Sequence, residues 1–302
     1  ATGSTQLPEI IAEIQQNGAG NPLVVVGMAL VIVAMSFKIA VVPFHMWTPD
    51  VYTGAPTPVT GFLSGAAKAA GFAVFVRVLL TGIPLDSPNW KNLLWILAVL
   101  TMTVGNVMAL RQNEVKRMLA FSSIAHAGYV LVAVVVGSSS SISSVIFYSC
   151  AYALMGTGAF GILTIKDAGR IPQTFDDLAG YGKRNPFLAL IMTLFIFSLI
   201  GLPLTGGFIG KLQIFSAALK DGWIWLTVIA ILNSVLSVYY YLRVVMFMYM
   251  REGALPEGSD LSAKTSGFAL TGLIGTAAAV LYLGVFPDEI MELASLSILA
   301  LL

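Results

Sequence analysis

Three lysines stand inside apolar runs long enough to cross a lipid bilayer, and they are the side chains of this sequence best suited to carry protons. They are Lys38, Lys68 and Lys211. A lysine at the middle of a spanning helix costs about 2.5 to 3.5 kcal/mol on insertion scales, so ionisable groups inside a membrane mark ion pathways by default. Burial disfavours the ammonium form, and a nearby negative charge restores it. Such an amine can load and release a proton when its neighbours or its access to water change.

Each lysine also has a structural interpretation, in which the side chain snorkels to the membrane surface. This interpretation fits Lys68 poorly, because Lys68 lies well inside its apolar run and small residues flank it on both sides. Small residues let neighbouring helices approach closely, so we expect Lys68 to face protein and not lipid. We expect Lys38 and Lys211 to be buried functional amines as well. The small residues around Lys68 are Gly61, Gly65, Ala66, Ala67, Ala69, Ala70 and Gly71.

The two histidines are further candidates. His126 follows Ser122 and Ser123 within an apolar run, and an imidazole exchanges protons near neutral pH. A lone histidine in a membrane is also commonly a hydrogen-bonded structural residue, but the hydroxyl neighbours favour a proton relay at His126. His45 lies beside Trp47 at the end of its span, where anchoring at the membrane surface fits as well as function does.

The lysines have no acidic partner in the predicted spans. All fifteen carboxylates of the chain fall in predicted loops or termini, and an unpaired buried charge is costly. We therefore expect the partner carboxylate to lie in an N-terminal part outside this chain or in an adjacent subunit.

Redox chemistry is not expected in this chain. It has one cysteine, Cys150, two histidines and a net charge of +1. One thiol excludes a disulfide framework, and this inventory is too small for an iron–sulfur cluster or a bis-histidine haem. We expect no metal site and no bound cofactor, and the near-zero net charge gives no basis for nucleic-acid binding.

Membrane-spanning helices must position these residues. Hydrophobic residues make up 57% of the chain and charged residues 10%, which predicts an all-α polytopic membrane protein. Residues 1–21 are polar and unlike a signal peptide, so we expect a loop outside the membrane, within a longer protein. The apolar tail after residue 286 is short and is expected to be an interfacial or packing helix. Eight stretches suit spanning helices, near residues 22–44, 56–80, 92–110, 118–137, 142–165, 187–219, 223–249 and 266–286.

Positive charges are distributed unequally between the two sides that these spans define. By the positive-inside rule, the richer side faces the cytoplasm and residues 1–21 face away from it. The richer side receives Arg111, Lys116, Arg117, Lys166, Arg170, Lys183, Arg184, Arg251 and Lys264, and the other side receives Lys91, Lys220 and, if its side chain snorkels, Arg77.

Two predicted spans contain residues that break helices. Pro43 interrupts the first span, and Pro203, Gly206 and Gly207 interrupt the sixth. Backbone groups freed inside a bilayer are tolerated only where protein or enclosed water satisfies them. The breaks are five spans apart, so the broken spans cross in opposite directions, as in an inverted repeat with discontinuous helices at a transport site.

One motif suggests nucleotide binding misleadingly, and we refer to its glycines as the decoy glycines. Residues 156–161 match the dinucleotide pattern G-x-G-x-x-G, but they lie inside a spanning run and lack the preceding strand that this motif requires. We expect these glycines to serve helix packing.

Two stretches carry a family resemblance. Residues 37–59 include Pro-Asp-Val-Tyr-Thr-Gly-Ala-Pro-Thr-Pro-Val, and residues 116–126 read Lys-Arg-Met-Leu-Ala-Phe-Ser-Ser-Ile-Ala-His. In these stretches the chain resembles the antiporter-like membrane subunits of respiratory complex I, and it looks most like the N-type subunits of proton-pumping NADH:quinone oxidoreductase. The resemblance runs over essentially the whole chain.

The resemblance implies an antiporter-like inverted-repeat fold, of which this chain would hold the last eight spans. The end of the first repeat would occupy residues 22–80, the whole second repeat 91–250, and the final span with its tail 251–302. Lys38 then matches the lysine of the first broken helix, Lys68 the lysine that links two half-channels, and Lys211 the lysine of the second broken helix. The glutamate that partners the first lysine in this family belongs to a span that is absent here.

The implied function is that of a proton-translocating, non-redox subunit of NADH:quinone oxidoreductase in the bacterial inner membrane. NADH, FMN, iron–sulfur clusters and quinone would be held by partner subunits, and a neighbouring antiporter-like subunit would be among the membrane partners. Two alternatives stay open from the residues. One is a subunit of a multisubunit cation/proton antiporter, and the other is a membrane scaffold in which the lysines only pair with neighbours.

Overall fold

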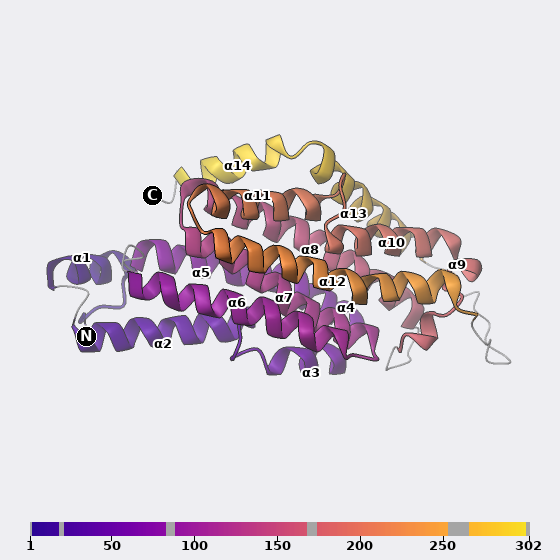
Figure 1. The fold of residues 1–302 in the computed structure, drawn as a ribbon, viewed down its shortest axis with the longest axis horizontal. Coiled ribbons are helices and arrows are strands. Elements are labelled where there is room, and N and C mark those ends of the chain that lie inside the picture. Colours follow the sequence, from indigo (N-terminus) through magenta and orange to yellow (C-terminus); the bar gives the residue numbers. More distant parts are fainter. Residues whose placement is uncertain (1, 18–20, 83–87, 168–173, 253–265, 300–302) are drawn as a thin grey trace.

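The computed structural model describes residues 2–17, 21–82, 88–167, 174–252 and 266–299. Within these ranges the chain is helical, and Glu114 and Thr174 form an isolated β-bridge outside any strand. Most of the long helices lie side by side along the long axis of the molecule (Figure 1). The helices are α1 (Leu7–Asn17), α2 (Pro22–Ile39), α3 (Trp47–Gly54), α4 (Thr57–Phe62), the π-helix η1 (Leu63–Ala67), α5 (Lys68–Gly82), α6 (Pro88–Leu110), α7 (Val115–Val136), α8 (Ser139–Asp167), the 3-10 helix η2 (Asp176–Leu178), α9 (Tyr181–Arg184), α10 (Pro186–Ile200), α11 (Gly206–Lys220), α12 (Ile224–Met250), α13 (Gly267–Val285) and α14 (Asp288–Leu299).

The predicted class, an all-α polytopic membrane protein, is confirmed. In the described part of the chain, seven helices are long and apolar enough to cross a membrane. The predicted sixth span, 187–219, corresponds to α10 and α11, each of fifteen residues, on either side of a break. The short helix α9 does not extend this span, because the segment 176–184 meets α10 at 119°. The C-terminal helix α14 packs against α8, as expected of a packing helix.

Residues 1–21 are not simply a loop. Leu7–Asn17 form α1, which packs against α5, and the expectation of a loop is wrong for these residues. The reason lies in the spacing of Ile10, Ile11 and Ile14, which places apolar side chains on one helical face. Ile14 is buried, and the polar residues between these positions kept the mean hydropathy of the segment low.

The first broken span differs from its predicted boundary at residue 44. Helix α2 ends at Ile39, because Ala40 adopts the left-handed conformation with φ 62°. Pro43 lies in the connection, and α3 follows beyond the C-terminal end of α2 (Figure 1). Side chains satisfy two backbone groups at this break, since the amide of Val42 donates to Thr101 Oγ1 at 3.1 Å and Trp47 Nε1 donates to the Phe37 carbonyl at 2.9 Å.

The second break lies where it was predicted. Helix α10 ends at Ile200, followed by Gly201 with φ 91°, and α11 begins at Gly206. The amide of Gly207 donates to Ser198 Oγ at 3.2 Å, so the side chain of one half caps the backbone of the other. In Figure 1, α2 and α3 run from left to right and α10 and α11 from right to left, as an inverted repeat requires.

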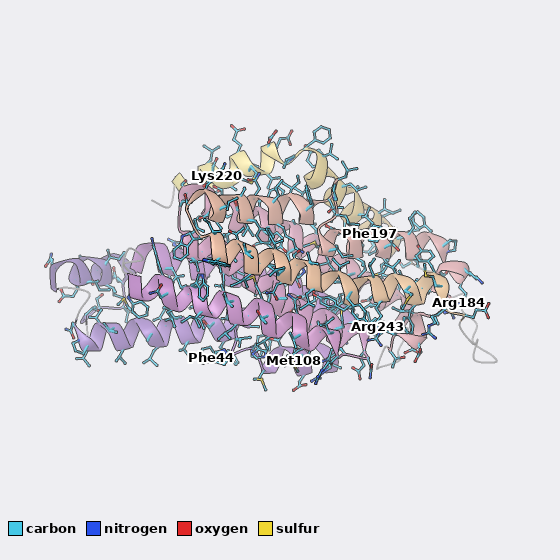
Figure 2. The ribbon with its side chains drawn as sticks, in the orientation of Figure 1. Phe44, Met108, Arg184, Phe197, Lys220 and Arg243 are labelled. Carbon is cyan, nitrogen blue, oxygen red and sulfur yellow. The ribbon has the colours of Figure 1, made fainter. Side chains whose placement is uncertain are left out.

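Helix α7 forms the centre of the bundle, and all of its residues except Arg117 are buried. It packs closely on α6, because a Cβ on Gly105 would come within 2.6 Å of the Ala125 amide nitrogen. The decoy glycines serve packing as expected: all three lie in α8, and Gly158 faces the Phe195 ring at a distance that admits no Cβ. Figure 2 places Arg184 and Lys220 toward opposite ends of the bundle, as the predicted topology requires.

Residues in the N-terminal turn of α7 contact α3, the helix that follows the first break, and the residue after it. Arg117 pairs with Asp50 of α3 at 2.7 Å, and Lys116 Nζ donates to the Ala55 carbonyl at 2.5 Å. Lys116 was assigned to a loop, but it belongs to α7 and is only 2% exposed.

The Arg117–Asp50 ion pair is expected to contribute little to stability. Its side chains are 34% and 72% exposed, and exposed pairs are typically worth about 0 to 1 kcal/mol. Replacing Arg117 with glutamine should lower the free energy of unfolding in detergent by less than about 1 kcal/mol, as should Asp50→Asn. A larger loss in both variants would mean that α3 depends on this pair for its position.

Candidate functional site

Lys68 stands at a break in helical regularity. The π-helix η1 ends at Ala67, and Lys68 begins α5; π-segments inside α-helices frequently occur at functional sites. Lys68 is 5% exposed, and its Nζ donates to the carbonyl of Ser123 at 2.6 Å and to its hydroxyl at 2.9 Å. The prediction that Lys68 faces protein is confirmed.

The small residues around Lys68 permit close helix packing, as predicted. A Cβ on Gly65 would lie 2.6 Å from Thr157 Oγ1 and 3.1 Å from the Ala153 carbonyl of α8. A Cβ on Gly61 would meet Phe160 at 3.3 Å. Larger side chains at these positions would separate this span from α8, so the glycines hold Lys68 in the bundle interior.

Lys211 lies on α11 and bridges the second break. Its Nζ donates to the carbonyls of Leu199 and Ile200 at 3.0 and 2.8 Å and to Ser234 Oγ at 3.0 Å. Those carbonyls end α10, and a helix C-terminus carries partial negative charge. The Nζ also lies 5.1 Å from the centre of the Tyr129 ring, a cation–π contact. Neutral groups therefore stabilise this buried ammonium where the sequence led us to expect a carboxylate.

His126 lies between these two lysines and is 2% exposed. Its Nδ1 is 2.5 Å from the Tyr148 hydroxyl, and its Nε2 is 2.9 Å from the Tyr241 hydroxyl. Positive charge on either Lys68 or Lys211 acts on His126 electrostatically. Both ring nitrogens have a partner that can donate or accept, so the imidazole can hold its proton on either nitrogen.

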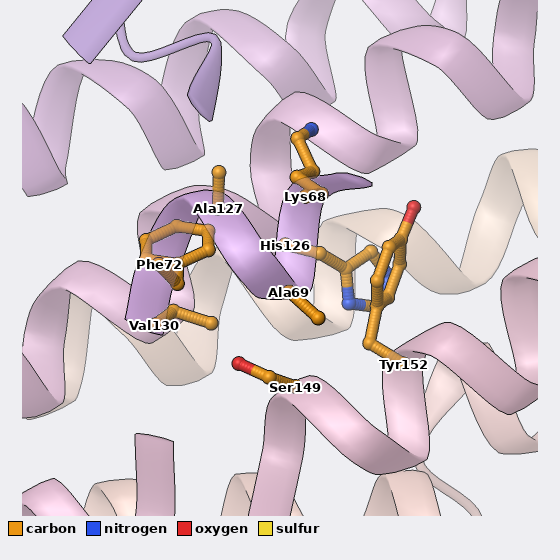
Figure 3. A pocket seen from close by; sticks show the side chains of 8 residues that line it. All are labelled: Lys68, Ala69, Phe72, His126, Ala127, Val130, Ser149 and Tyr152. Atoms are coloured by element: carbon orange, nitrogen blue, oxygen red, sulfur yellow. The ribbon is translucent and has the colours of Figure 1, made fainter. Parts of the chain in front are cut away.

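Lys68 and His126 both line a small cavity (Figure 3). Its volume is about 10 Å³, about the space for one water molecule. Ser149 Oγ points into this space in Figure 3 and has no hydrogen-bond partner among the described residues. The cavity lining is Lys68, Ala69, Phe72, His126, Ala127, Val130, Ser149 and Tyr152.

Lys38 is placed differently from the expectation. It is exposed at the C-terminal end of α2, so the prediction of a buried amine is wrong for the described chain. Its stem passes Gly71 of α5, but no described helix covers the face of α2 that carries it, where Phe37 is also exposed. At the same break, Ser36 Oγ, His45 Nδ1 and Thr48 Oγ1 are buried without a partner among the described residues. His45 is thus a buried side chain and not an exposed anchor.

Sequence reasoning missed the tyrosines of the site. The hydroxyls of Tyr52 and Tyr152 both interact with the Ser123 hydroxyl, and the Tyr152 ring lies 4.9 Å from the His126 ring. Tyrosine is enriched at membrane surfaces, so Tyr152, deep inside the predicted span 142–165, was the available signal. The polar pair Asn106 and Asn233, which joins α6 to α12, was missed as well: Asn106 Nδ2 donates to Asn233 Oδ1 at 3.1 Å and to the Asn233 carbonyl at 3.2 Å.

The polar groups of the site lie along one face of α7. Ser123 contacts Lys68, His126 follows three residues later, and Tyr129, after three more, faces Lys211. Residues three and four apart share a helix face. With a rise of about 1.5 Å per residue, the groups that hold the two amines are roughly 9 Å apart along α7. The site is therefore a buried polar strip along one side of α7.

Comparison with known proteins agrees with this architecture. A family model described as NADH:quinone oxidoreductase/Mrp antiporter, TM, matches residues 1–237. The NADH-quinone oxidoreductase subunit N of Trichlorobacter lovleyi is 49% identical over 97% of this chain. The chain spans 60% of that relative's length.

Solved structures show the same fold. A chain of respiratory complex I from Thermus thermophilus superposes with a TM-score of 0.78 at 34% identity, covering 91% of this chain and 60% of that one. A chain of the Mrp complex from Dietzia sp. superposes with a TM-score of 0.85 at 23% identity, covering 97% and 62%. The matched family model, the apolar helices and the two oppositely directed breaks lead to one conclusion: this chain belongs to the NADH:quinone oxidoreductase/Mrp antiporter transmembrane family.

Proposed function

We propose that this chain is part of a proton-translocating membrane subunit of NADH-quinone oxidoreductase. Protons pass through Lys68, His126 and Lys211, and quinone reduction in partner subunits drives their movement. The observation that supports this most is the face of α7, where Ser123, His126 and Tyr129 contact or flank both buried amines. The identity of 49% to a subunit N supports the same assignment.

Each side chain of the strip has a distinct task. Lys68 holds a proton against the two oxygens of Ser123 and releases it when nearby charge changes. The cavity beside it accommodates one water that can carry a proton toward His126. Lys211 holds a proton against the carbonyl end of α10, so a shift of α10 relative to α11 changes how well that proton is held.

Lys38 completes the path in this proposal. Its exposed position lets a carboxylate from another span, in the same protein or in a neighbouring subunit, approach the amine. Such an acid would stabilise the ammonium, and its withdrawal would release the proton. The unpartnered oxygens and nitrogen of Ser36, Thr48 and His45 beside the break would then face this contact or its water.

We further propose that NADH, FMN, iron–sulfur clusters and quinone are bound by partner subunits. One cysteine and two histidines are too few to hold a cluster in this chain. The partners include other membrane subunits, one of them antiporter-like, and the surrounding lipid. The membrane is the bacterial inner membrane, in keeping with the bacterial source of the relative from Trichlorobacter lovleyi.

A subunit of a cation/proton antiporter is the alternative. The description of the matched family, which covers both NADH:quinone oxidoreductase and the Mrp antiporter, supports it. Both functions use buried lysines, so the partners and the driving reaction separate them.

The experiment compares inverted membrane vesicles from cells with and without the full-length protein, with other proton pumps inhibited. NADH is expected to acidify the vesicles only when the protein is present, and the protein is expected to co-migrate with NADH dehydrogenase activity in mild detergent. Equal acidification in both preparations would overturn the proposal. Sodium–proton exchange that needs the protein but not NADH would instead establish the antiporter.

A further inference from the structure

The hydroxyl of Tyr241 contacts both His126 Nε2 and the Ser122 hydroxyl, and neither contact involves Lys68 or Lys211. We propose that Ser122, Tyr241, His126 and Tyr148 form one hydrogen-bonded relay, in which the Tyr241 hydroxyl determines which ring nitrogen of His126 carries the proton. This inference rests on the proposed function, because it assigns the step by which His126 passes protons within the strip.

The four groups form an unbroken chain from three helices. Ser122 and His126 lie on α7, Tyr148 on α8 and Tyr241 on α12. The Nε2 contact is 2.9 Å and the Nδ1 contact with Tyr148 is 2.5 Å. All four side chains are at most 2% exposed, so bulk water does not compete for these hydrogen bonds.

Each member has one proton to donate and a lone pair to accept another. The hydrogen bonds of the relay can all point in one of two directions, which we call its two polarities. In one polarity, Ser122 donates to Tyr241, Tyr241 donates to Nε2, and Nδ1 donates to Tyr148. In the other polarity, Tyr148 donates to Nδ1, Nε2 donates to Tyr241, and Tyr241 donates to Ser122. The direction of the Tyr241 hydroxyl thus fixes the tautomer of His126.

A proton that passes along the relay converts one polarity into the other. If a proton arrives at the Tyr148 oxygen, Tyr148 gives its own proton to Nδ1 and Nε2 gives its proton to Tyr241. Tyr241 then gives its proton to Ser122, and the proton that Ser122 held before passes from its hydroxyl to a water molecule. One proton enters and one leaves, so no member stays charged. The hydrogen bonds must return to their starting direction before the next transfer, which limits the relay to one proton at a time.

Tyr240 lies next to this relay but cannot replace Tyr241. Its hydroxyl interacts with Ser122 and Tyr241, yet it donates its only proton to Asn106 Oδ1 at 2.8 Å. A phenol has one proton, so in this arrangement Tyr240 accepts from the relay and does not supply it. Tyr241 is therefore the hydroxyl that joins His126 to Ser122.

The test uses the full-length protein in its membrane complex and replaces Tyr241 with phenylalanine, which removes only the hydroxyl. NADH-driven acidification is expected to fall by about tenfold or more, because positioned proton-transfer groups contribute about 10²- to 10⁴-fold. Ser122→Ala should act in the same direction, and the double variant should be no worse than Tyr241→Phe. Ser122→Thr, which keeps the hydroxyl, should retain acidification. Tyr239→Phe removes an exposed hydroxyl from the same helix and is the control.

A spectroscopic measurement separates relay from packing. Nitrogen-15 chemical shifts of labelled histidine distinguish protonated from bare ring nitrogens, and the difference from a His126→Gln sample isolates His126. Tyr241→Phe is expected to change its tautomer ratio, and Tyr239→Phe is expected to leave it unchanged.

Three outcomes would overturn the relay: normal acidification in Tyr241→Phe, an unchanged tautomer ratio, or additive losses in the double variant. The proposed function is tested separately by Lys68. If Lys68→Met loses acidification while Tyr241→Phe keeps it, the relay alone fails. If both variants keep it, the proposed function fails.

Discussion

Replacing Lys68 with methionine in the full-length protein is expected to abolish NADH-driven acidification of inverted vesicles while the complex still assembles. Methionine is unbranched and of similar length, so it fills the space of the lysine stem but cannot carry a proton. We expect a fall of at least about tenfold, since positioned proton-transfer groups contribute about 10²- to 10⁴-fold. The cost to folding should be modest, because Ser123 Oγ also donates to the Ala120 carbonyl at 2.7 Å.

The Lys68→Arg variant distinguishes a role of Lys68 in proton relay from a purely structural role. Lys68→Arg keeps a positive charge and hydrogen-bond donors toward Ser123, but a guanidinium does not deprotonate under physiological conditions. A relay therefore predicts that Lys68→Arg fails almost as fully as Lys68→Met. A scaffold, in which the charge only pairs with its neighbours, predicts that arginine restores pumping.

The matched control is Lys220, an exposed lysine at the C-terminal end of α11. Lys220→Met removes one positive charge without touching the polar strip, and it should leave acidification unchanged. Normal pumping by an assembled Lys68→Met complex would remove Lys68 from the proton path.

Adding a single methyl group at Gly207 is expected to disrupt the second broken span. A Cβ at this position would lie 1.9 Å from the Ser198 carbonyl oxygen and 3.0 Å from its hydroxyl. The obstacle is backbone, so α11 must move away from α10. This movement would pull Lys211 from the carbonyls of Leu199 and Ile200 that hold its ammonium. Overpacking typically costs about 1 to 3 kcal/mol, and the loss of bonds to a buried charge adds to it.

The measurements for Gly207→Ala are the amount of assembled complex and its melting temperature in mild detergent, followed by acidification of what assembles. Gly272→Ala in α13 makes the same chemical change where a Cβ meets nothing within 4 Å, and it should behave like the parent protein. If Gly207→Ala assembled and pumped normally, the close contact of α10 and α11 would not be needed to hold Lys211.

The site illustrates how a buried amine is stabilised without an acid. The sequence showed no carboxylate in any predicted span, which led to the expectation of a partner elsewhere. For Lys211 the compensation is the C-terminal end of α10 together with a hydroxyl and an aromatic ring. A helix end lies inside the membrane only because the span is broken, so the break supplies the carbonyl groups that stabilise the lysine. For Lys38 the acid partner stays a prediction, and the exposed position of this lysine in the described chain leaves room for one.

The hydrophobic runs by themselves determined the class of the protein, the eight spans and the two breaks. This follows because spanning helices need about 20 apolar residues, and because a proline within such a run, or a proline with several glycines beside it, interrupts the helix. The same local rules placed Lys68 deep in a span flanked by glycines, and they rejected the dinucleotide motif in α8. Local rules were less reliable at the ends, where α1 forms within residues 1–21 and α2 stops before Pro43.

Only the tertiary structure decided which polar groups meet. Tyr241 lies 115 residues from His126 along the chain, and Ser234 lies 23 residues from Lys211, yet each pair is in hydrogen-bonding contact. Tyr148 and Tyr152 reach His126 from α8, and no periodicity within one helix could indicate this. Local sequence sets which face of a helix a residue occupies, but the rotation and depth at which helices pack set its neighbours. For the same reason Lys38 and Lys68, alike in sequence as lysines in apolar runs, differ in exposure: α7 covers one of them, and no described helix covers the other.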